Sequence, residues 1–192
     1  MPEAPGQRVF RQDLNLEERL LVLARTRGHD ARVERAVAGF SRLGEHGALW
    51  LAIGFAGGIV QRARGPEWRR ARRTVLVTYA VNTAIKFVVR RRRPNLPGLA
   101  PLTGTTTGLS FPSAHAATSF AAALVYRRRG LPAGPLYGVA GAMACSRVYL
   151  GVHYPSDILA GAALGSVLGV ALGGPAGPAT EPDGLAVPGE TR

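Results

Sequence analysis

Three short stretches of this sequence contain most of the side chains that could do chemistry. The first is the basic run 86–94 (KFVVRRRRP), the second is 111–115 (FPSAH), and the third is 146–157 (SRVYLGVHYPSD). Together they supply several cations, two histidines and one carboxylate. Guanidinium and ammonium groups form charge-assisted hydrogen bonds to phosphate oxygens. A set of cations with few acids to neutralise them therefore predicts a phosphate-binding site.

Two histidines beside a bound phosphate can divide the work of phosphoryl transfer. A neutral imidazole can attack phosphorus, while a protonated one gives its proton to the departing oxygen. His153 is followed four residues later by Asp157, and a carboxylate at that spacing can fix the imidazole tautomer and stabilise its cation. By elimination we predict that His153 is the nucleophile, Asp157 its partner and His115 the acid.

Other groups are expected to surround the phosphate. Lys86, Arg93 and Arg147 would supply cationic donors if the three stretches meet. Ser113 follows a proline and stands where a helix N-cap would stand. The free amide groups of the turn that follows, including that of Ala114, would then point at an anion.

The scarcity of carboxylates argues against a metal-dependent mechanism. Asp157 is the only acidic residue between Trp68 and Thr180, whereas magnesium and two-metal sites need several acidic ligands. Two histidines and one aspartate could nominally hold zinc, but the surrounding cations disfavour it. We expect no metal and no cofactor.

Some of these residues also have simpler interpretations. Arg90, Arg91 and Arg92 are expected to form a solvated flank that anchors a helix end at a membrane interface. Taken alone, Lys86 could extend its ammonium group toward that interface. Cys145 is the only cysteine, which excludes an internal disulfide, and its apolar surroundings predict a small buried packing residue.

Five apolar segments must position these clusters: 47–60, 74–89, 113–126, 134–150 and 158–172. Each is shorter than the roughly 20 residues that usually span a bilayer, but polar flanks lengthen them. Five apolar runs with almost no acid among them exceed what the core of a small soluble domain needs, and the small residues of 161–165 (GAALG) would let helices approach closely. We predict an all-α fold, a polytopic membrane helix bundle of about five spans. If the segments alternate in direction, the three clusters emerge on one face.

The ends of the chain have a different composition. Residues 14–40 predict two charged amphipathic helices, with a capping box at Asn15 and Glu18 and a break at 27–30 (RGHD). These helices are too polar to span, so they could lie on the membrane surface. The first 15 residues have no apolar core of signal-peptide length, and 173–192 are typical of a disordered tail. The predicted domains are an amphipathic helical region (1–45), a membrane-embedded domain that carries the site (46–172) and the tail (173–192).

The three clusters, in this order, resemble the signature of the type 2 phosphatidic acid phosphatase and vanadium haloperoxidase superfamily: K-x6-RP, then PSGH, then SR-x5-H-x3-D. Residues 86–94 fit the first motif and 146–157 the last. The middle motif departs from the pattern, because Ala114 replaces the glycine while keeping its backbone amide. The likeness covers roughly residues 74–172. Members are typically six-helix membrane proteins that act on lipid phosphates, so the first span would here be missing or replaced by the amphipathic region.

The resemblance also implies a role for each matched residue. It implies a phosphohistidine intermediate on His153, with Asp157 as the partner of that histidine and His115 as the acid. It further implies that the phosphoryl oxygens are bound by Lys86, Arg93, Ser113, the Ala114 amide and Arg147. A second likeness, in 40–47 (FSRLGEHG), is similar to small actinobacterial members assigned to the dephosphorylation of decaprenylphosphoryl-phosphoribose in cell-wall arabinan synthesis.

We therefore expect a lipid phosphatase, with a polyprenyl phosphosugar ahead of phosphatidate, phosphatidylglycerophosphate or undecaprenyl diphosphate as substrate. A vanadate-dependent peroxidase or soluble acid phosphatase would use the same site, but the five apolar segments disfavour it. A non-catalytic basic protein that binds membranes or nucleic acid would explain the arginines. It would not explain why Lys86, His115, His153 and Asp157 occur in register.

The charge distribution bears on partners and location. A net charge of +12 fits an anionic partner, and we expect a lipid phosphate substrate and a membrane but no nucleic acid. Arginines concentrate between the first and second apolar segments and between the third and fourth. The positive-inside rule places those loops in the cytoplasm and the active face outside a bacterial cell membrane, although the arginine-rich N-terminal region would then also lie outside.

Overall fold

The computed structural model describes residues 14–175 of the chain. Its elements are α2 (Leu16–Thr26), α3 (Ala31–Leu43), η1 (Glu45–Gly47), α4 (Ala48–Val60), η2 (Arg62–Arg64), α5 (Gly65–Val89), α6 (Ala114–Arg127), α7 (Ala133–Tyr149) and α8 (Pro155–Leu172). The predicted all-α fold is confirmed for these residues. Most of the predicted tail lies outside the described range, as do 13 of the first 15 residues, for which no signal peptide is predicted.

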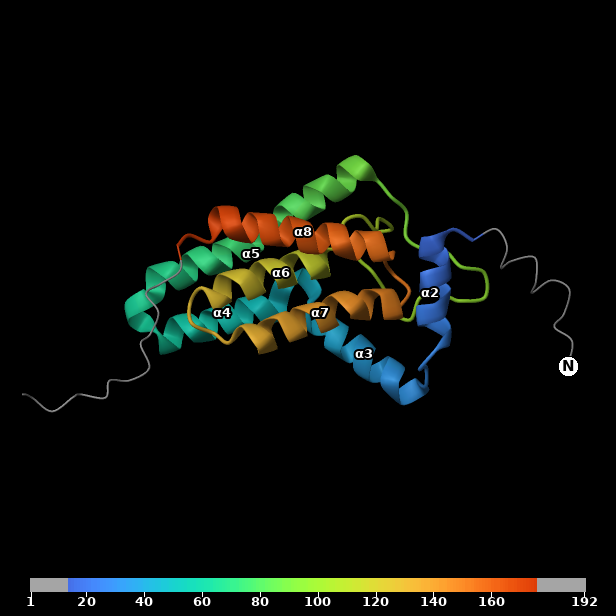
Figure 1. Ribbon diagram of the computed structural model, residues 1–192, viewed down its shortest axis with the longest axis horizontal. Coiled ribbons are helices and arrows are strands. Elements are labelled where there is room, and N and C mark those ends of the chain that lie inside the picture. Colours follow the sequence, from blue (N-terminus) through green and yellow to red (C-terminus); the bar gives the residue numbers. More distant parts are fainter. Residues whose placement is uncertain (1–13, 176–192) are drawn as a thin grey trace, which may run out of the picture.

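The helices form a bundle with one helix across its end. In Figure 1, α4 to α8 run along the long axis of the molecule, whereas α2 lies across the end formed by α7 and α8. Helix α6 is central, because it packs against α5, α7 and α8, while α2 packs against α7 and α8. The five apolar segments correspond to α4 through α8, and α5 begins earlier than predicted, at Gly65.

The N-terminal helices begin where the sequence predicts, and α3 continues three residues past the predicted end, to Leu43. The capping box before α2 is present, because Asn15 Oδ1 accepts from the amide of Glu18 and the Glu18 carboxylate accepts from the amide of Asn15, both at 3.0 Å. Asp30 caps α3 by accepting from the amides of Arg32 and Val33. The predicted break at 27–30 therefore separates two capped helices.

The chain bends between α3 and α4. His46 and Gly47 both have positive φ, 54° and 74°, a left-handed conformation that interrupts a helix. Of the helices described, α8 alone is long and apolar enough to cross a membrane by itself. The pair formed by α3 and residues 45–60 passes the same test jointly, with a bend of 47°.

The contact between α6 and α8 depends on glycine. A Cβ atom at Gly161 would lie 2.5 Å from the carbonyl oxygen of Ser113, and one at Gly165 would overlap the carbonyl of Ala117. The two helix backbones therefore touch where no side chain intervenes, as in small-residue packing of membrane helices. The predicted close approach at 161–165 is confirmed.

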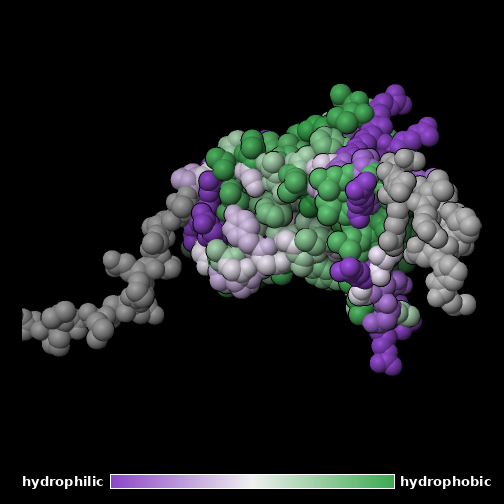
Figure 2. Space-filling model, turned by 45° about the vertical axis from the view of Figure 1, so that its right-hand side comes forward, coloured by the Kyte–Doolittle hydropathy of each residue, from purple (hydrophilic) through white to green (hydrophobic). Residues whose placement is uncertain are grey.

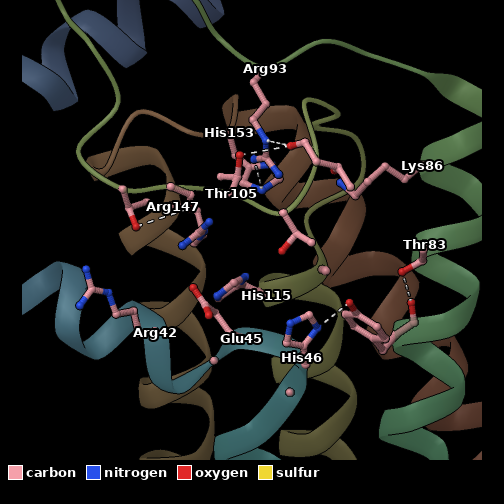
Figure 3. Close-up of a pocket in the computed structure, with 18 residues that line it drawn as sticks. Arg42, Glu45, His46, Thr83, Lys86, Arg93, Thr105, His115, Arg147 and His153 are labelled. Atoms are coloured by element: carbon pink, nitrogen blue, oxygen red, sulfur yellow. Dashed lines mark hydrogen bonds between the residues drawn. The ribbon is translucent and has the colours of Figure 1, made fainter.

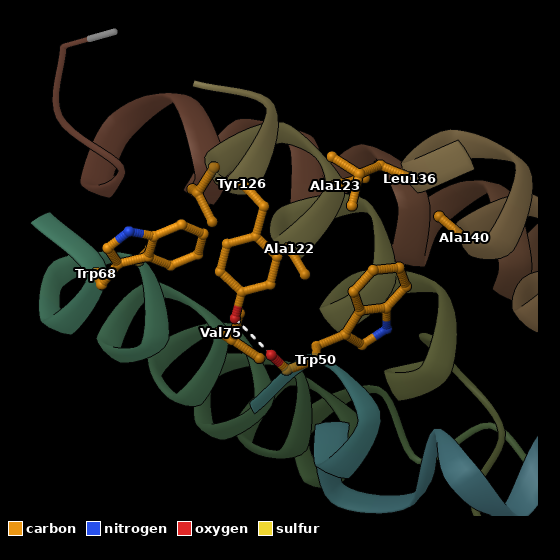
Figure 4. Close-up of a cluster of buried hydrophobic side chains, with 10 residues drawn as sticks. Trp50, Trp68, Val75, Ala122, Ala123, Tyr126, Leu136 and Ala140 are labelled. Carbon is orange, nitrogen blue, oxygen red and sulfur yellow. Dashed lines mark hydrogen bonds between the residues drawn. The ribbon is translucent and has the colours of Figure 1, made fainter. Parts of the chain in front are cut away.

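Aromatic side chains fill the bundle between α4, α5 and α6 (Figure 4). Trp50, Trp68 and Tyr126 are fully buried. The Tyr126 hydroxyl donates to the carbonyl of Trp50 at 2.6 Å, and the Trp50 indole N–H donates to Ser119 Oγ at 2.8 Å. The polar atoms of these rings are thus paired inside an apolar core.

Large apolar side chains also cover the outside of the bundle. Figure 2 shows hydrophobic residues over its body and hydrophilic ones toward its ends. Exposed examples lie on α4, α5 and α8: Phe55, Ile59, Leu76, Phe87, Leu159, Val167 and Val170. The prediction of a buried Cys145 is wrong, because the buried side of α7 holds Ala140, Met143 and Arg147 and helical periodicity turns Cys145 outward.

The two arginine-rich loops meet at one end of the bundle. Arg64 donates to the carbonyl of Arg129 at 3.2 Å, and Arg129 is paired with Glu67 at 3.1 Å. These contacts join the α4–α5 connection to the α6–α7 connection, at the end of the bundle away from α2 (Figure 1).

The α6–α8 contact leads to a stability prediction. Gly165→Ala should force the helices apart, and overpacking of this kind lowers the free energy of unfolding by about 1–3 kcal/mol. Thermal or denaturant unfolding of the full-length protein in detergent would measure it. Gly141→Ala on α7 is the matched control, because its Cβ would meet no atom within 4 Å and alanine favours helix over glycine. Equal stability of the two variants would contradict the predicted role of Gly165.

Candidate active site

A cavity of about 510 Å³ opens beside η1 (Figure 3). Its lining includes six of the eight predicted site residues: Lys86, Arg93, Ala114, His115, Arg147 and His153. The other two, Ser113 and Asp157, are fully buried and contact the lining residues from behind. The cavity lies where the end of α5, the start of α6, the end of α7 and the start of α8 meet, so the structure brings the three sequence clusters together.

His153 lies in the loop before α8 and contacts a buried carboxylate. Its Nδ1 is 3.3 Å from Asp157 Oδ2, and its Nε2 is 3.1 Å from Arg93 Nη1. A guanidinium group can only donate, so Nε2 must carry a lone pair and Nδ1 the proton that Asp157 accepts. Burial lowers the pKa of His153 to about 3. The imidazole is therefore neutral at pH 7, and its Nε2 lone pair, which accepts from Arg93, lies at the cavity.

His115 is held by the segment between α3 and α4. Its Nε2 is 3.1 Å from the carbonyl oxygen of Ser41, which can only accept, so Nε2 carries a proton. Its ring packs over Gly44, where a Cβ would lie 2.8 Å from the ring carbon Cδ2. The second histidine thus faces the cavity from α6 with an orientation fixed by residues far away in sequence.

Lys86 is buried and does not extend toward an interface. Its ammonium group donates to the carbonyl oxygens of Leu109, Ser110 and Pro112 at 3.2, 3.0 and 3.0 Å. These bonds tie the end of α5 to the loop that leads into α6. These three carbonyls occupy all three N–H donors of the ammonium group. In this conformation Lys86 therefore contributes its charge to the cavity. A direct hydrogen bond to a phosphoryl oxygen would replace one of the bonds to a carbonyl.

Two arginines of the cavity are also held by neutral groups. Arg93 donates to the carbonyls of Thr107 and Val152 at 2.8 and 2.7 Å. Arg147 donates to Ser41 Oγ at 2.7 Å, and its buried Nε has no partner among the described residues. Burial lowers the pKa of Arg93 to about 10, so this side chain stays charged at neutral pH. No carboxylate neutralises either guanidinium by direct contact within residues 14–175.

Such a set of side chains suits an anion. Across residues 14–175, no group of three or more His, Cys, Asp or Glu side chains is arranged to hold a metal ion. The charged donors at the cavity are instead one ammonium and three guanidinium groups, including that of Arg42, beside three imidazoles. Cationic donors that retain unneutralised charge bind phosphate oxygens strongly.

Ser113 and Ala114 begin α6. Ser113 is the N-cap, as predicted, and its hydroxyl accepts from the amide of Ala116 at 3.5 Å. Its own amide donates to the carbonyl of Asp157 at 2.9 Å. The hydroxyl is therefore turned to the helix and away from the cavity lining, whereas Ala114 lines the cavity as the first residue of the helix.

The prediction that Arg90, Arg91 and Arg92 form a solvated flank is wrong for Arg91. Its guanidinium donates to Asp157 Oδ1 at 3.0 Å and to Glu17 Oε2 at 2.6 Å. The physical reason is the end of α5, where Arg90 adopts a left-handed conformation with φ of 55° and turns the next side chain back toward α8. Arg90 and Arg92 are exposed, as predicted.

The outer part of the cavity contains residues that the sequence did not identify as site residues. Glu45 and His46 come from η1, and Tyr79 and Thr83 from α5. His46 Nδ1 is 2.7 Å from the Tyr79 hydroxyl. The threonine-rich loop 103–107 (TGTTT) lines the opposite side. The family likeness at 40–47 could have indicated that Ser41, Glu45 and His46 belong to the site. The run of threonines between the first two motifs could have indicated that loop 103–107 lines it.

Comparison with known proteins gives related sequences and a related fold. Residues 73–172 match the PAP2 superfamily. A decaprenylphosphoryl-5-phosphoribose phosphatase of Mycobacterium tuberculosis is 46% identical over 132 residues, 68% of this chain and 73% of that protein. The protein of the same name from Mycolicibacterium smegmatis is 41% identical over 149 residues, 70% and 82% of the two chains. A transmembrane PAP2-type phosphatidylglycerolphosphate phosphatase from Bacillus subtilis has the same fold, with a TM-score of 0.68 at 21% identity, covering 88% of this chain and 86% of that one.

The cation-lined cavity predicts that an inorganic phosphate analogue binds it. Orthovanadate should raise the unfolding midpoint of the protein in detergent. At a concentration of 100 times its Kd, it should raise the free energy of unfolding by about 2.7 kcal/mol. Arg93→Gln should weaken this binding by roughly 10-fold or more, since hydrogen bonds to charged groups contribute about 1.5–3 kcal/mol. Arg92→Gln, at an exposed neighbour, is the control. Equal shifts in both variants would remove Arg93 from the anion site.

Proposed function

The chain belongs to the PAP2 superfamily. On that premise we propose that it is an integral-membrane phosphatase. It hydrolyses the phosphomonoester of a polyprenyl-linked phosphosugar through a phosphohistidine intermediate. The observation that carries the reaction class is the paired His153. Its Nδ1–H faces Asp157, and its Nε2 lone pair contacts Arg93 at a cavity that Lys86 and Arg147 also line. A nucleophile, a charge partner and a phosphate-binding surface thus meet at one point.

The chemistry follows from this geometry. His153 Nε2 attacks phosphorus, and the bond between phosphorus and the sugar oxygen breaks. That oxygen takes a proton from His115, which enters this step as the imidazolium, a form that the bound phosphate anion stabilises, and leaves it neutral. The charge that spreads over the other phosphoryl oxygens is stabilised by Arg93, Arg147 and the Ala114 amide. Asp157 stabilises the imidazolium of the intermediate. Water then attacks phosphorus as neutral His115 takes its proton, and phosphate leaves His153.

The substrate class rests on the relatives and on the outer cavity. The two mycobacterial relatives, at 46% and 41% identity, are named for decaprenylphosphoryl-5-phosphoribose. Beyond the cations, the cavity offers the Glu45 carboxylate, the Tyr79 and Thr83 hydroxyls and the threonine loop 103–107. Such neutral and acidic acceptors suit the hydroxyl groups of a sugar, and Arg42, which also lines the cavity, suits the second phosphate of a polyprenyl-phosphoryl phosphosugar.

We further propose that α4 to α8 are five membrane spans, within a domain of residues 46–172 that follows an amphipathic region, 1–45. Apolar side chains exposed on α4, α5 and α8 support this arrangement, as does the fold shared with a transmembrane phosphatase. The arginine-rich loops lie at the end of the bundle away from α2 (Figure 1). By the positive-inside rule that end is cytoplasmic, so the site faces the outside.

Phosphate release from a panel of lipids tests the function. The purified protein in detergent with excess EDTA would be given a polyprenyl-phosphoryl phosphopentose, phosphatidate, phosphatidylglycerophosphate and undecaprenyl diphosphate. We expect the highest kcat/KM on the phosphopentose, and His153→Ala should reduce that turnover by at least about 1,000-fold, as loss of a nucleophile does. A higher kcat/KM on a glycerolipid phosphate would overturn the substrate class. Activity that needs magnesium or zinc would overturn the metal-free chemistry.

The role of His115 can be separated from phosphate binding by the leaving group. His115→Ala should lower turnover of an alkyl phosphate by roughly 100-fold or more, because a departing alkoxide needs a proton. An activated aryl phosphate should lose much less, since its phenolate leaves without one. Both rates would be measured on the same preparation. Equal losses on the two substrates would mean that His115 binds phosphate or holds structure.

A further inference from the structure

The carboxylate of Asp157 is divided between two tasks. One oxygen, Oδ2, accepts from His153 Nδ1 and from the amide of Tyr154 at 2.9 Å. The other oxygen, Oδ1, accepts from Arg91 Nη1 at 3.0 Å. Asp157 has no exposed surface, so its rotation about the Cβ–Cγ bond is set by these partners. Among the residues that the structure describes, Arg91 is the only cation paired with Asp157 other than the histidine itself.

Arg91 is itself fixed on several sides. Nη1 also donates to Ser156 Oγ at 2.6 Å, and Nη2 donates to Glu17 Oε2 at 2.6 Å. The guanidinium carbon lies 4.1 Å from the centre of the Tyr154 ring, a distance typical of a cation–π contact. A planar group with this many directed contacts has one orientation and transmits it to the carboxylate it binds.

Glu17 connects this arginine to α2. Its Oε2 binds Arg91, and its Oε1 accepts from the amide of Ser156 in the first turn of α8, at 2.9 Å. One side chain of the crossing helix thus holds both the guanidinium and the start of the helix that carries Asp157. The order of charges from α2 to the cavity is Glu17, Arg91, Asp157, His153, alternating in sign if the imidazole becomes protonated.

We propose that Arg91 and Glu17 are positioning residues for the His153–Asp157 pair, a proposal that rests on the proposed function. Arg91 keeps Asp157 turned so that Oδ2 faces His153, and Glu17 keeps Arg91 in place. Glu17 also offsets the charge of Arg91, which would otherwise weaken the attraction of Asp157 for the imidazolium of the intermediate. Arg91 occupies a variable position of the K-x6-RP motif, and Glu17 lies outside the family match at 73–172.

The test compares Arg91→Gln, Arg91→Lys, Glu17→Gln and the double variant Arg91→Gln/Glu17→Gln in the full chain. Arg91→Gln should lower kcat by roughly 10–100-fold, in the range expected when a supporting contact of a catalytic group is lost, with KM nearly unchanged. Glu17→Gln should lower kcat by less, and the double variant should match Arg91→Gln because both act through one chain of contacts. Arg91→Lys should recover part of the loss.

Matched controls separate positioning from general damage. Arg92→Gln removes an exposed neighbouring charge, and Glu18→Gln changes the next residue of α2 while keeping a side chain that can complete the capping box. Both should keep kcat within about 2-fold, the range of neutral surface changes. Equal losses in Arg91→Gln and Arg92→Gln, multiplicative effects of the two substitutions, or a loss confined to KM would each overturn the proposal.

A measurement without substrate distinguishes this proposal from the proposed function. Nitrogen-15 NMR of histidine-labelled protein, with His153→Ala for assignment, should show the Nδ1–H tautomer of His153 in the wild type and a changed signal in Arg91→Gln but not in Arg92→Gln. If the protein releases phosphate from none of the lipids and the signal still changes in Arg91→Gln, the proposed function is wrong and the positioning role of Arg91 stands. If Arg91→Gln is fully active on the lipids and its His153 signal is unchanged, the proposed function stands and the positioning role of Arg91 is wrong.

Discussion

The close contact between α6 and α8 is the constraint on which the site depends. Gly161 and Gly165 let the backbones of these helices touch, and the amide of Ser113 donates to the carbonyl of Asp157 at 2.9 Å across the contact. The two helix starts are therefore held side by side. His115 belongs to one start and His153 precedes the other, so the distance between the two imidazoles is set by a helix–helix contact made of glycines and backbone groups.

The charged residues of the site divide into two kinds by the partners that hold them. Lys86, Arg93 and Arg147 are held by carbonyls, a hydroxyl and an imidazole, and neutral acceptors leave the positive charge available to a ligand. Arg91 is held by the carboxylates of Asp157 and Glu17, and its charge is used within the protein. Four cations in one small region can thus serve both binding and support without competing.

Much of the site followed from the sequence, because helix periodicity and the end positions of apolar segments fix where Lys86, His115 and Asp157 must meet. Two features did not follow. Among four consecutive arginines, spacing alone could not tell Arg91 from Arg90 and Arg92, since the turn after α5 decides where each points. Ser41 holds His115 through its backbone carbonyl, a contact that any residue type at this position could make.

The cavity has a shape with consequences for kinetics. Its lining extends along α5 from Lys86 to Tyr79, seven residues or about 10 Å of helix, so it runs from the cations down the side of the bundle. If α5 spans a bilayer, as proposed, a lipid-linked substrate would reach the histidines laterally, from within one leaflet. Turnover then responds to the mole fraction of substrate in the surface, and diluting it with inert lipid or detergent slows the enzyme even when its bulk concentration stays constant.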